Sequence, residues 1–98
     1  MNDQQKQQIL KQGWQIHDLI EATYASLPAA EGDEDWLEKQ RFLLADMAIH
    51  LLQTSLKPGE IDLDKLRNNF HAILTIGDQF LPQAELKQAT QKLYQIQN

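Results

Sequence analysis

The spacing of the apolar residues is the feature that most limits how this chain can fold. Apolar positions recur every three or four residues, the period of an amphipathic helix, and no segment shows the sustained alternation of a half-buried strand. Helix-stopping and turn-forming residues interrupt this pattern at residues 28–33 and 57–60, and more weakly at 77–82. The sequence therefore predicts an all-α chain with four helices.

The breaks divide the chain into four predicted helices, at residues 3–27, 33–56, 62–77 and 82–96. Asp33 and Asp62 are suited to cap the second and third helices, because a carboxylate accepts hydrogen bonds from the first free amides. Pro82 is suited to the first turn of the fourth. Since short connections make consecutive helices antiparallel, we expect a single domain over residues 1–98, an up-down four-helix bundle with a longer first hairpin.

Composition excludes several classes of function. The 98 residues are 42% hydrophobic and 23% charged, which is typical of one small globular domain. The chain has no cysteine, and this excludes disulfides, thiolate metal sites and cysteine nucleophiles. The nine Lys and Arg residues form no basic stripe and the net charge is −5, so we expect no nucleic-acid partner.

The chain also lacks the features of a membrane or exported protein. Its most apolar stretch, residues 42–52, is interrupted by Asp46 and His50 and is shorter than the ~20 residues that span a bilayer. The first residues do not have the basic-then-apolar layout of a signal peptide. We therefore expect a cytoplasmic protein with no membrane partner.

The first two predicted helices carry more apolar surface than one core-facing stripe requires. In the second helix the main stripe is Leu37, Leu44, Met47, Ala48 and Leu51, and a separate set recurs at seven-residue spacing, namely Phe42, Ile49 and Leu56. In the first helix, Leu10 and Trp14 form a pair about 120° from the stripe of Ile9, Ile16 and Ile20. Either both helices are central and both sets are core, or the second sets are exposed and bind a partner.

Our main hypothesis is a non-enzymatic protein-interaction module, of the adaptor, chaperone, immunity or inhibitor kind, that binds through its first helical hairpin. The predicted partner-binding residues are Leu10, Trp14, Phe42, Ile49 and Leu56. A self-complementary patch would form a symmetric homodimer, and any other patch would dock a helix of another protein. We expect no catalytic residues and no cofactor, because phosphate-binding glycine loops, nucleophile elbows and His-Glu-x-x-His motifs are absent.

The alternative hypothesis is a metal-binding or histidine phosphorelay bundle that uses Asp46 and His50. These residues stand one turn apart on a polar strip of the second helix, as half of a metal site or an acid–base pair would require. The other histidines, His17 and His71, lie on other predicted helices, so the sequence does not show whether they converge. A weak ion pair on a solvated face explains the same spacing. The leucines that follow His50 also differ from the lysine and small residue that phosphotransfer domains place there.

Overall fold

The computed structural model describes residues 2–95, and these residues form four α-helices and no strand. The helices are α1 (Asp3–Ser26), α2 (Trp36–Leu56), α3 (Leu63–Gly77) and α4 (Leu86–Lys92), with a short 3₁₀ helix, η1 (Pro82–Ala84), before α4. The predicted all-α fold with four helices is confirmed. Within the described residues, no helix is both long enough and apolar enough to cross a membrane.

The helix starts follow from side chains that satisfy free backbone amides. Asn2 accepts a hydrogen bond from the amide of Gln5, whose side chain in turn accepts from the amide of Asn2. Asp62 caps α3 as predicted, since its carboxylate accepts from the amides of Asp64 and Lys65.

The predicted cap of the second helix is wrong. The carboxylate of Asp33 accepts a hydrogen bond from the amide of Ala30, inside the turn that joins α1 to α2. The N-cap position of α2 is occupied by Asp35, and the helix begins at Trp36. Asp33 therefore stabilises the connection rather than the helix end.

The fourth predicted helix is broken into two pieces. Glu85 has a φ of 57°, in the left-handed region, and it separates η1 from α4. Beyond Glu85, α4 turns back along α3. Leu86 of α4 lies beside Gly77 of α3, since a Cβ added to Gly77 would be 3.5 Å from Cδ1 of Leu86. Ile96, which the sequence assigned to this helix, lies outside the described residues.

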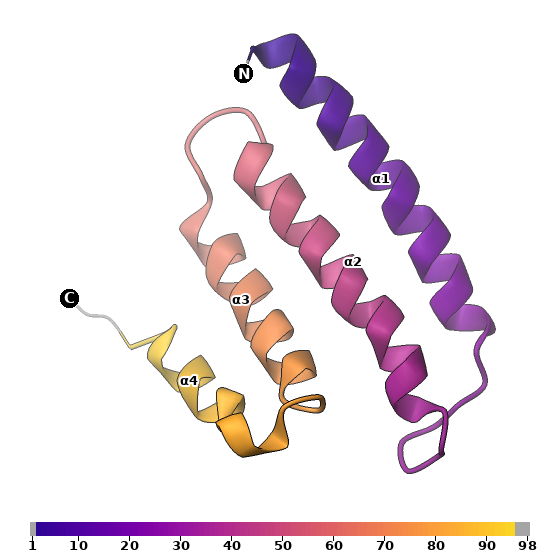
Figure 1. Cartoon of the computed structure of the whole chain (residues 1–98). Helices are drawn as coiled ribbons and strands as arrows, with labels where there is room; N and C mark the ends of the chain where they lie inside the picture. The colour runs from indigo at the N-terminus through magenta and orange to yellow at the C-terminus, as the bar shows by residue number, and fades with distance from the viewer. Residues whose placement is uncertain (1, 96–98) are drawn as a thin grey trace.

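The helices follow the predicted up-down order, and each packs mainly against its neighbours in sequence (Figure 1). The first hairpin is the longer one, with helices of 24 and 21 residues against 15 and 7 in the second. The molecule measures 44 × 38 × 16 Å, and its radius of gyration is 15.4 Å. A compact chain of this length would have about 12.6 Å. The bundle is therefore open, with α1 and α4 at opposite edges.

Few side chains of this open bundle are fully buried, and most of those few are polar. Among the described residues, Ile76 is the one hydrophobic side chain that is buried, whereas Gln40, Asp46, Gln53 and Thr90 are buried polar residues. Leu37, which the sequence placed on the core stripe of its helix, remains exposed, as do Leu63 and Phe70 of α3. An edge helix packs against one neighbouring helix, and a central helix packs against two. Side chains that point toward either broad face of this thin layer of helices therefore stay in solvent. Three of the buried polar residues lie on α2, between α1 and α3.

Candidate functional site

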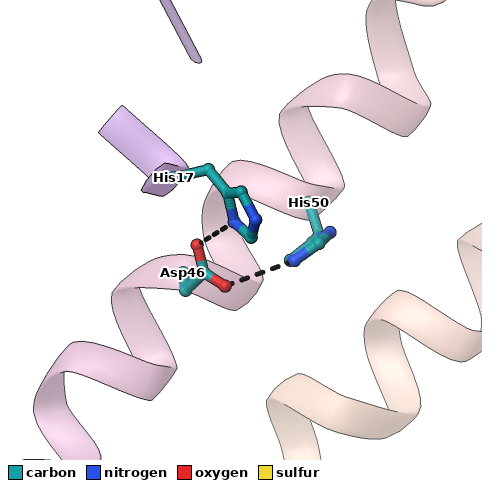
Figure 2. A group of neighbouring side chains, drawn as sticks. All are labelled: His17, Asp46 and His50. Carbon is teal, nitrogen blue, oxygen red and sulfur yellow. Dashed lines mark hydrogen bonds and ion pairs between the residues drawn. The ribbon is translucent and has the colours of Figure 1, made fainter. Parts of the chain in front are cut away.

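Two histidines and an aspartate converge where α1 meets α2 (Figure 2). Nδ1 of His17, on α1, donates a hydrogen bond to Oδ1 of Asp46, on α2, at 2.6 Å. Nε2 of His50, also on α2, lies 3.2 Å from Oδ2 of the same carboxylate. One donor atom from each of the three side chains lies within 4.8 Å of the others. We call this group the His17–Asp46–His50 cluster.

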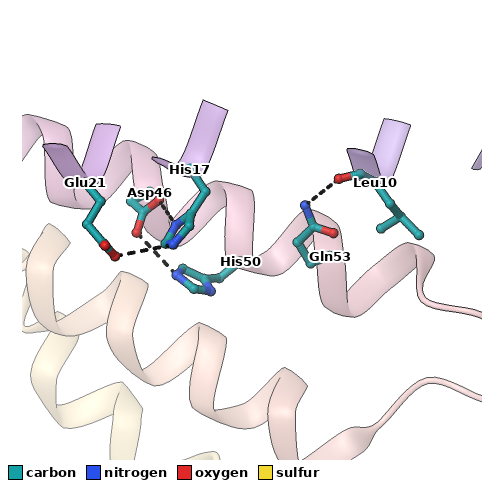
Figure 3. A network of polar contacts seen from close by, with 6 residues as sticks. All are labelled: Leu10, His17, Glu21, Asp46, His50 and Gln53. Atoms are coloured by element: carbon teal, nitrogen blue, oxygen red, sulfur yellow. Dashed lines mark hydrogen bonds and ion pairs between the residues drawn. The ribbon is translucent and has the colours of Figure 1, made fainter. Parts of the chain in front are cut away.

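The cluster forms because α1 approaches α2 closely. Asp46 and His50 share one side of α2, since residues four apart are neighbours on a helix. Gly13, one turn before His17, faces α2, and a Cβ at this position would lie 2.4 Å from Nε2 of Gln53. Because Gly13 has no side chain, the amide of Gln53 fits there and donates a hydrogen bond to the carbonyl oxygen of Leu10 at 3.1 Å (Figure 3). The missing side chain of Gly13 thus allows the approach that brings His17 to Asp46.

The burial of Asp46 contradicts the interpretation of this strip as a solvated face. Only 6% of the residue is exposed, because α1 covers it. A buried carboxylate is tolerated when it is hydrogen-bonded, and here each of its oxygen atoms meets an imidazole nitrogen. The sequence singled out Asp46 and His50 but did not join His17 to them. The available signal was the position of His17 near the Leu10–Trp14 side of the first helix.

The electrostatic surroundings of His17 are acidic. The hydrogen bond to Asp46 raises the pKa of His17 above its ordinary value, while partial burial opposes this shift. Oε2 of Glu21, one turn along α1, lies 3.3 Å from Nε2 of His17 (Figure 3). Both ring nitrogens of His17 therefore face a carboxylate.

Trp14 lies against the two imidazole rings. Its ring meets that of His17 edge to face at a centroid distance of 5.4 Å, and that of His50 in the same manner at 6.2 Å. Trp14 and His50 also border a pocket of about 380 Å³ that reaches Asn68 on α3. The cluster is thus partly shielded by an aromatic ring, and His50 remains reachable from solvent, with 34% of its side chain exposed.

The predicted partner-binding residues occupy different environments. Trp14 is 47% exposed, whereas Leu10, Phe42, Ile49 and Leu56 are half-buried. Phe42 borders a cleft together with Ile20 and Tyr24 of α1.

Two further apolar side chains of α1 are open to solvent, and the sequence did not identify either as a binding residue. Ile16 is 46% exposed and Leu19 is 69% exposed. Ile16 was assigned to the core stripe of its helix. It is exposed because α2 is the one helix that packs substantially against α1.

The arrangement offers two kinds of chemistry. The cluster has two imidazoles and a carboxylate that can exchange a proton or hold a cation, and α1 has apolar side chains that can be covered by another protein. Comparisons of the chain with models of protein families, with curated proteins and with solved structures found no match.

Proposed function

We propose that this chain is a protein-interaction module that pairs with a second copy of itself through the hairpin of α1 and α2. The observation that carries this proposal is the exposure of Trp14, Ile16 and Leu19 on an edge helix. Ile16 and Leu19 lie about 60° apart around α1 and form one exposed apolar strip, with Trp14 on another side of the helix. Exposed apolar strips of this kind are characteristic of a surface that another protein covers.

The amount of exposed surface supports the proposal. The chain exposes 7065 Å². A compact protein of 11.3 kDa exposes about 5,700 Å², from the scaling of surface with mass. The surplus of about 1,300 Å² exceeds the roughly 800 Å² that each partner contributes to a stable interface of standard size. A second molecule would also supply the apolar contacts that an interior with one buried aliphatic residue lacks.

A second copy fits the dimensions of the hairpin. At 1.5 Å per residue, α1 and α2 are about 36 and 32 Å long. Two such hairpins stacked face to face make a four-helix bundle, and a two-fold axis covers the same patch on both molecules. Trp14 and Leu19 are about 140° apart around α1, so a substitution at each position tests a different side of the hairpin.

Sedimentation equilibrium over a range of protein concentrations tests this proposal. We expect a mass of twice 11.3 kDa, and a monomer in at least one of the variants Trp14→Asp and Leu19→Asp. Leu81→Asp is the matched control, because Leu81 is 58% exposed but lies outside the first hairpin. Circular dichroism verifies that each variant is folded. A native chain that is monomeric throughout, or a dimer that both hairpin substitutions leave intact, would overturn the proposal.

We further infer that this module is non-enzymatic, resides in the cytoplasm and does not bind nucleic acid. Its net charge of −5 and the scatter of its nine basic residues along the chain support the last of these three inferences. Retention on a polyanion column such as heparin at moderate salt would contradict the last point.

A further inference from the structure

We propose that His17, Asp46 and His50 bind one divalent transition-metal ion, with zinc as the reference ion. Two imidazole nitrogens and a carboxylate oxygen are ligands that Zn²⁺ takes in proteins, and other first-row divalent ions accept the same set. The three side chains come from two helices and already point toward one another (Figure 2).

The three donor atoms lie within 4.8 Å of one another, so a tetrahedral ion requires the widest separation to close by up to about 1.5 Å. With metal–ligand distances of about 2.0–2.1 Å, ligand atoms in a tetrahedral site lie about 3.3 Å apart. Nε2 of His50 is 3.2 Å from Oδ2 of Asp46, whereas Nδ1 of His17 contacts Oδ1 of the same carboxylate. The 2.6 Å contact between His17 and Asp46 is shorter because a proton joins the two atoms. Replacing that proton by a metal requires this contact to open by about 0.7 Å, which rotation of the side chains can supply.

Charge balance favours a divalent ion at this position. Asp46 and Glu21 bring two negative charges to the cluster, one against each ring nitrogen of His17. A divalent cation bound to neutral imidazoles offsets both carboxylates, and the proton on Nδ1 of His17 leaves to solvent as the metal binds.

Glu21 is placed to orient the imidazole ring of His17. Metal-binding histidines commonly donate their other ring N–H to a carboxylate, which sets the tautomer and the ring orientation. With the metal on Nδ1 of His17, its Nε2–H would donate to Glu21, whose Oε2 is 3.3 Å away (Figure 3). Trp14 adds an apolar shield on one side of the two imidazoles.

Three protein ligands leave one tetrahedral position for water or for a group of another molecule. The partly exposed side chain of His50 borders the pocket that it shares with Trp14, so an ion can enter from solvent. The geometry thus points to an open coordination site rather than a closed structural one.

A zinc titration against a chromophoric chelator tests the site. We expect one zinc ion per chain in the native protein, and binding at least about tenfold weaker in His50→Gln, because losing a ligand costs no less than losing an outer contact. His71→Gln is the matched control, since this exposed histidine lies on α3 and outside the cluster. It should bind zinc as the native protein does. Equal affinities of His50→Gln and the native protein, or no saturable binding at one ion per chain, would overturn the proposal.

A second measurement leaves all three ligands in place, so it does not depend on how His50→Gln folds. Substituting Trp36→Phe makes Trp14 the single tryptophan, and a paramagnetic Cu²⁺ ion in the cluster should quench its fluorescence saturably at one equivalent. In the complementary Trp14→Phe chain, Trp36 should be quenched much less by the same equivalent. Equal quenching of the two tryptophans would contradict binding at the cluster. Neither experiment requires the protein to be a dimer.

Discussion

The side-chain amide of Gln53 on α2 donates a hydrogen bond to the backbone carbonyl of Leu10 on α1, with 3.1 Å between nitrogen and oxygen. The amide occupies the space that a side chain at Gly13 would fill. This contact and the link between His17 and Asp46 lie about two turns apart on α1. Together they add polar contacts to a helix pair in which apolar side chains such as Leu52 also approach α1.

Gly13→Ala should destabilise the protein, although alanine is the better helix former. The added Cβ would displace the buried amide of Gln53 from its hydrogen bond to Leu10, and leaving a buried polar group without a partner costs about 1–3 kcal/mol of unfolding free energy. In a Gln53→Ala background this overlap is gone and Cδ2 of Leu52, at 3.2 Å, is the nearest remaining contact, so the same substitution should cost less and gain at most about 1 kcal/mol. Urea unfolding of the native chain, the two single variants and the double variant measures this double-mutant cycle. An equal cost in both backgrounds would show that the two residues do not compete for space.

Asp46→Asn should destabilise the metal-free protein by about 1.5–3 kcal/mol, because the buried carboxylate accepts charge-assisted hydrogen bonds that an amide does not replace. Glu38→Gln is the control. It weakens an ion pair with Arg41 in which both side chains are about two thirds exposed, and it should cost no more than about 0.5 kcal/mol. Chemical unfolding in the presence of a chelator measures both. Similar costs for the two substitutions would mean that the burial of Asp46 has little energetic consequence.

Zinc should raise the unfolding temperature, since an ion that binds the folded state stabilises it by mass action. At a free concentration of one hundred times Kd, the gain is about 2.7 kcal/mol. Differential scanning fluorimetry should show this increase in the native chain and in His71→Gln, at most about half of the stabilisation in His50→Gln, and its reversal by excess chelator. An increase of the same size in His50→Gln would assign the stabilisation to another site.

Gln40→Met should destabilise the protein by about 1–3 kcal/mol, the cost of leaving buried polar groups without partners. Gln40 is 2% exposed, and its Oε1 accepts a hydrogen bond from Gln79, which accepts one from the indole of Trp36. The substitution therefore removes the acceptor of the Nε2–H group of Gln79, and the fluorescence of Trp36, which donates to Oε1 of Gln79, should shift with it. Gln91→Met, at an exposed position, should change stability by less than about 0.5 kcal/mol. Urea unfolding compares the two.

Local sequence signals were sufficient for the elements and their order. The three- and four-residue apolar spacing predicted the helices, and Asp62 was correctly identified as a cap because a cap needs only the amides that follow it. Two local predictions were wrong. Asp33 bonds to Ala30 in the turn instead of capping α2, and the left-handed Glu85 divides the last predicted helix.

The sequence by itself thus determined four helices, antiparallel neighbours and a longer first hairpin, since these depend on short-range periodicity and on short connections. Tertiary structure decided that the bundle stays open, that Asp46 is buried and that His17 joins it. Each of these depends on how two helices are rotated about their axes and how closely they approach. Asp46 and His17 are 29 residues apart, so no local pattern links them. Their contact exists because α1 packs against α2 with His17 and Asp46 on the facing sides of the two helices.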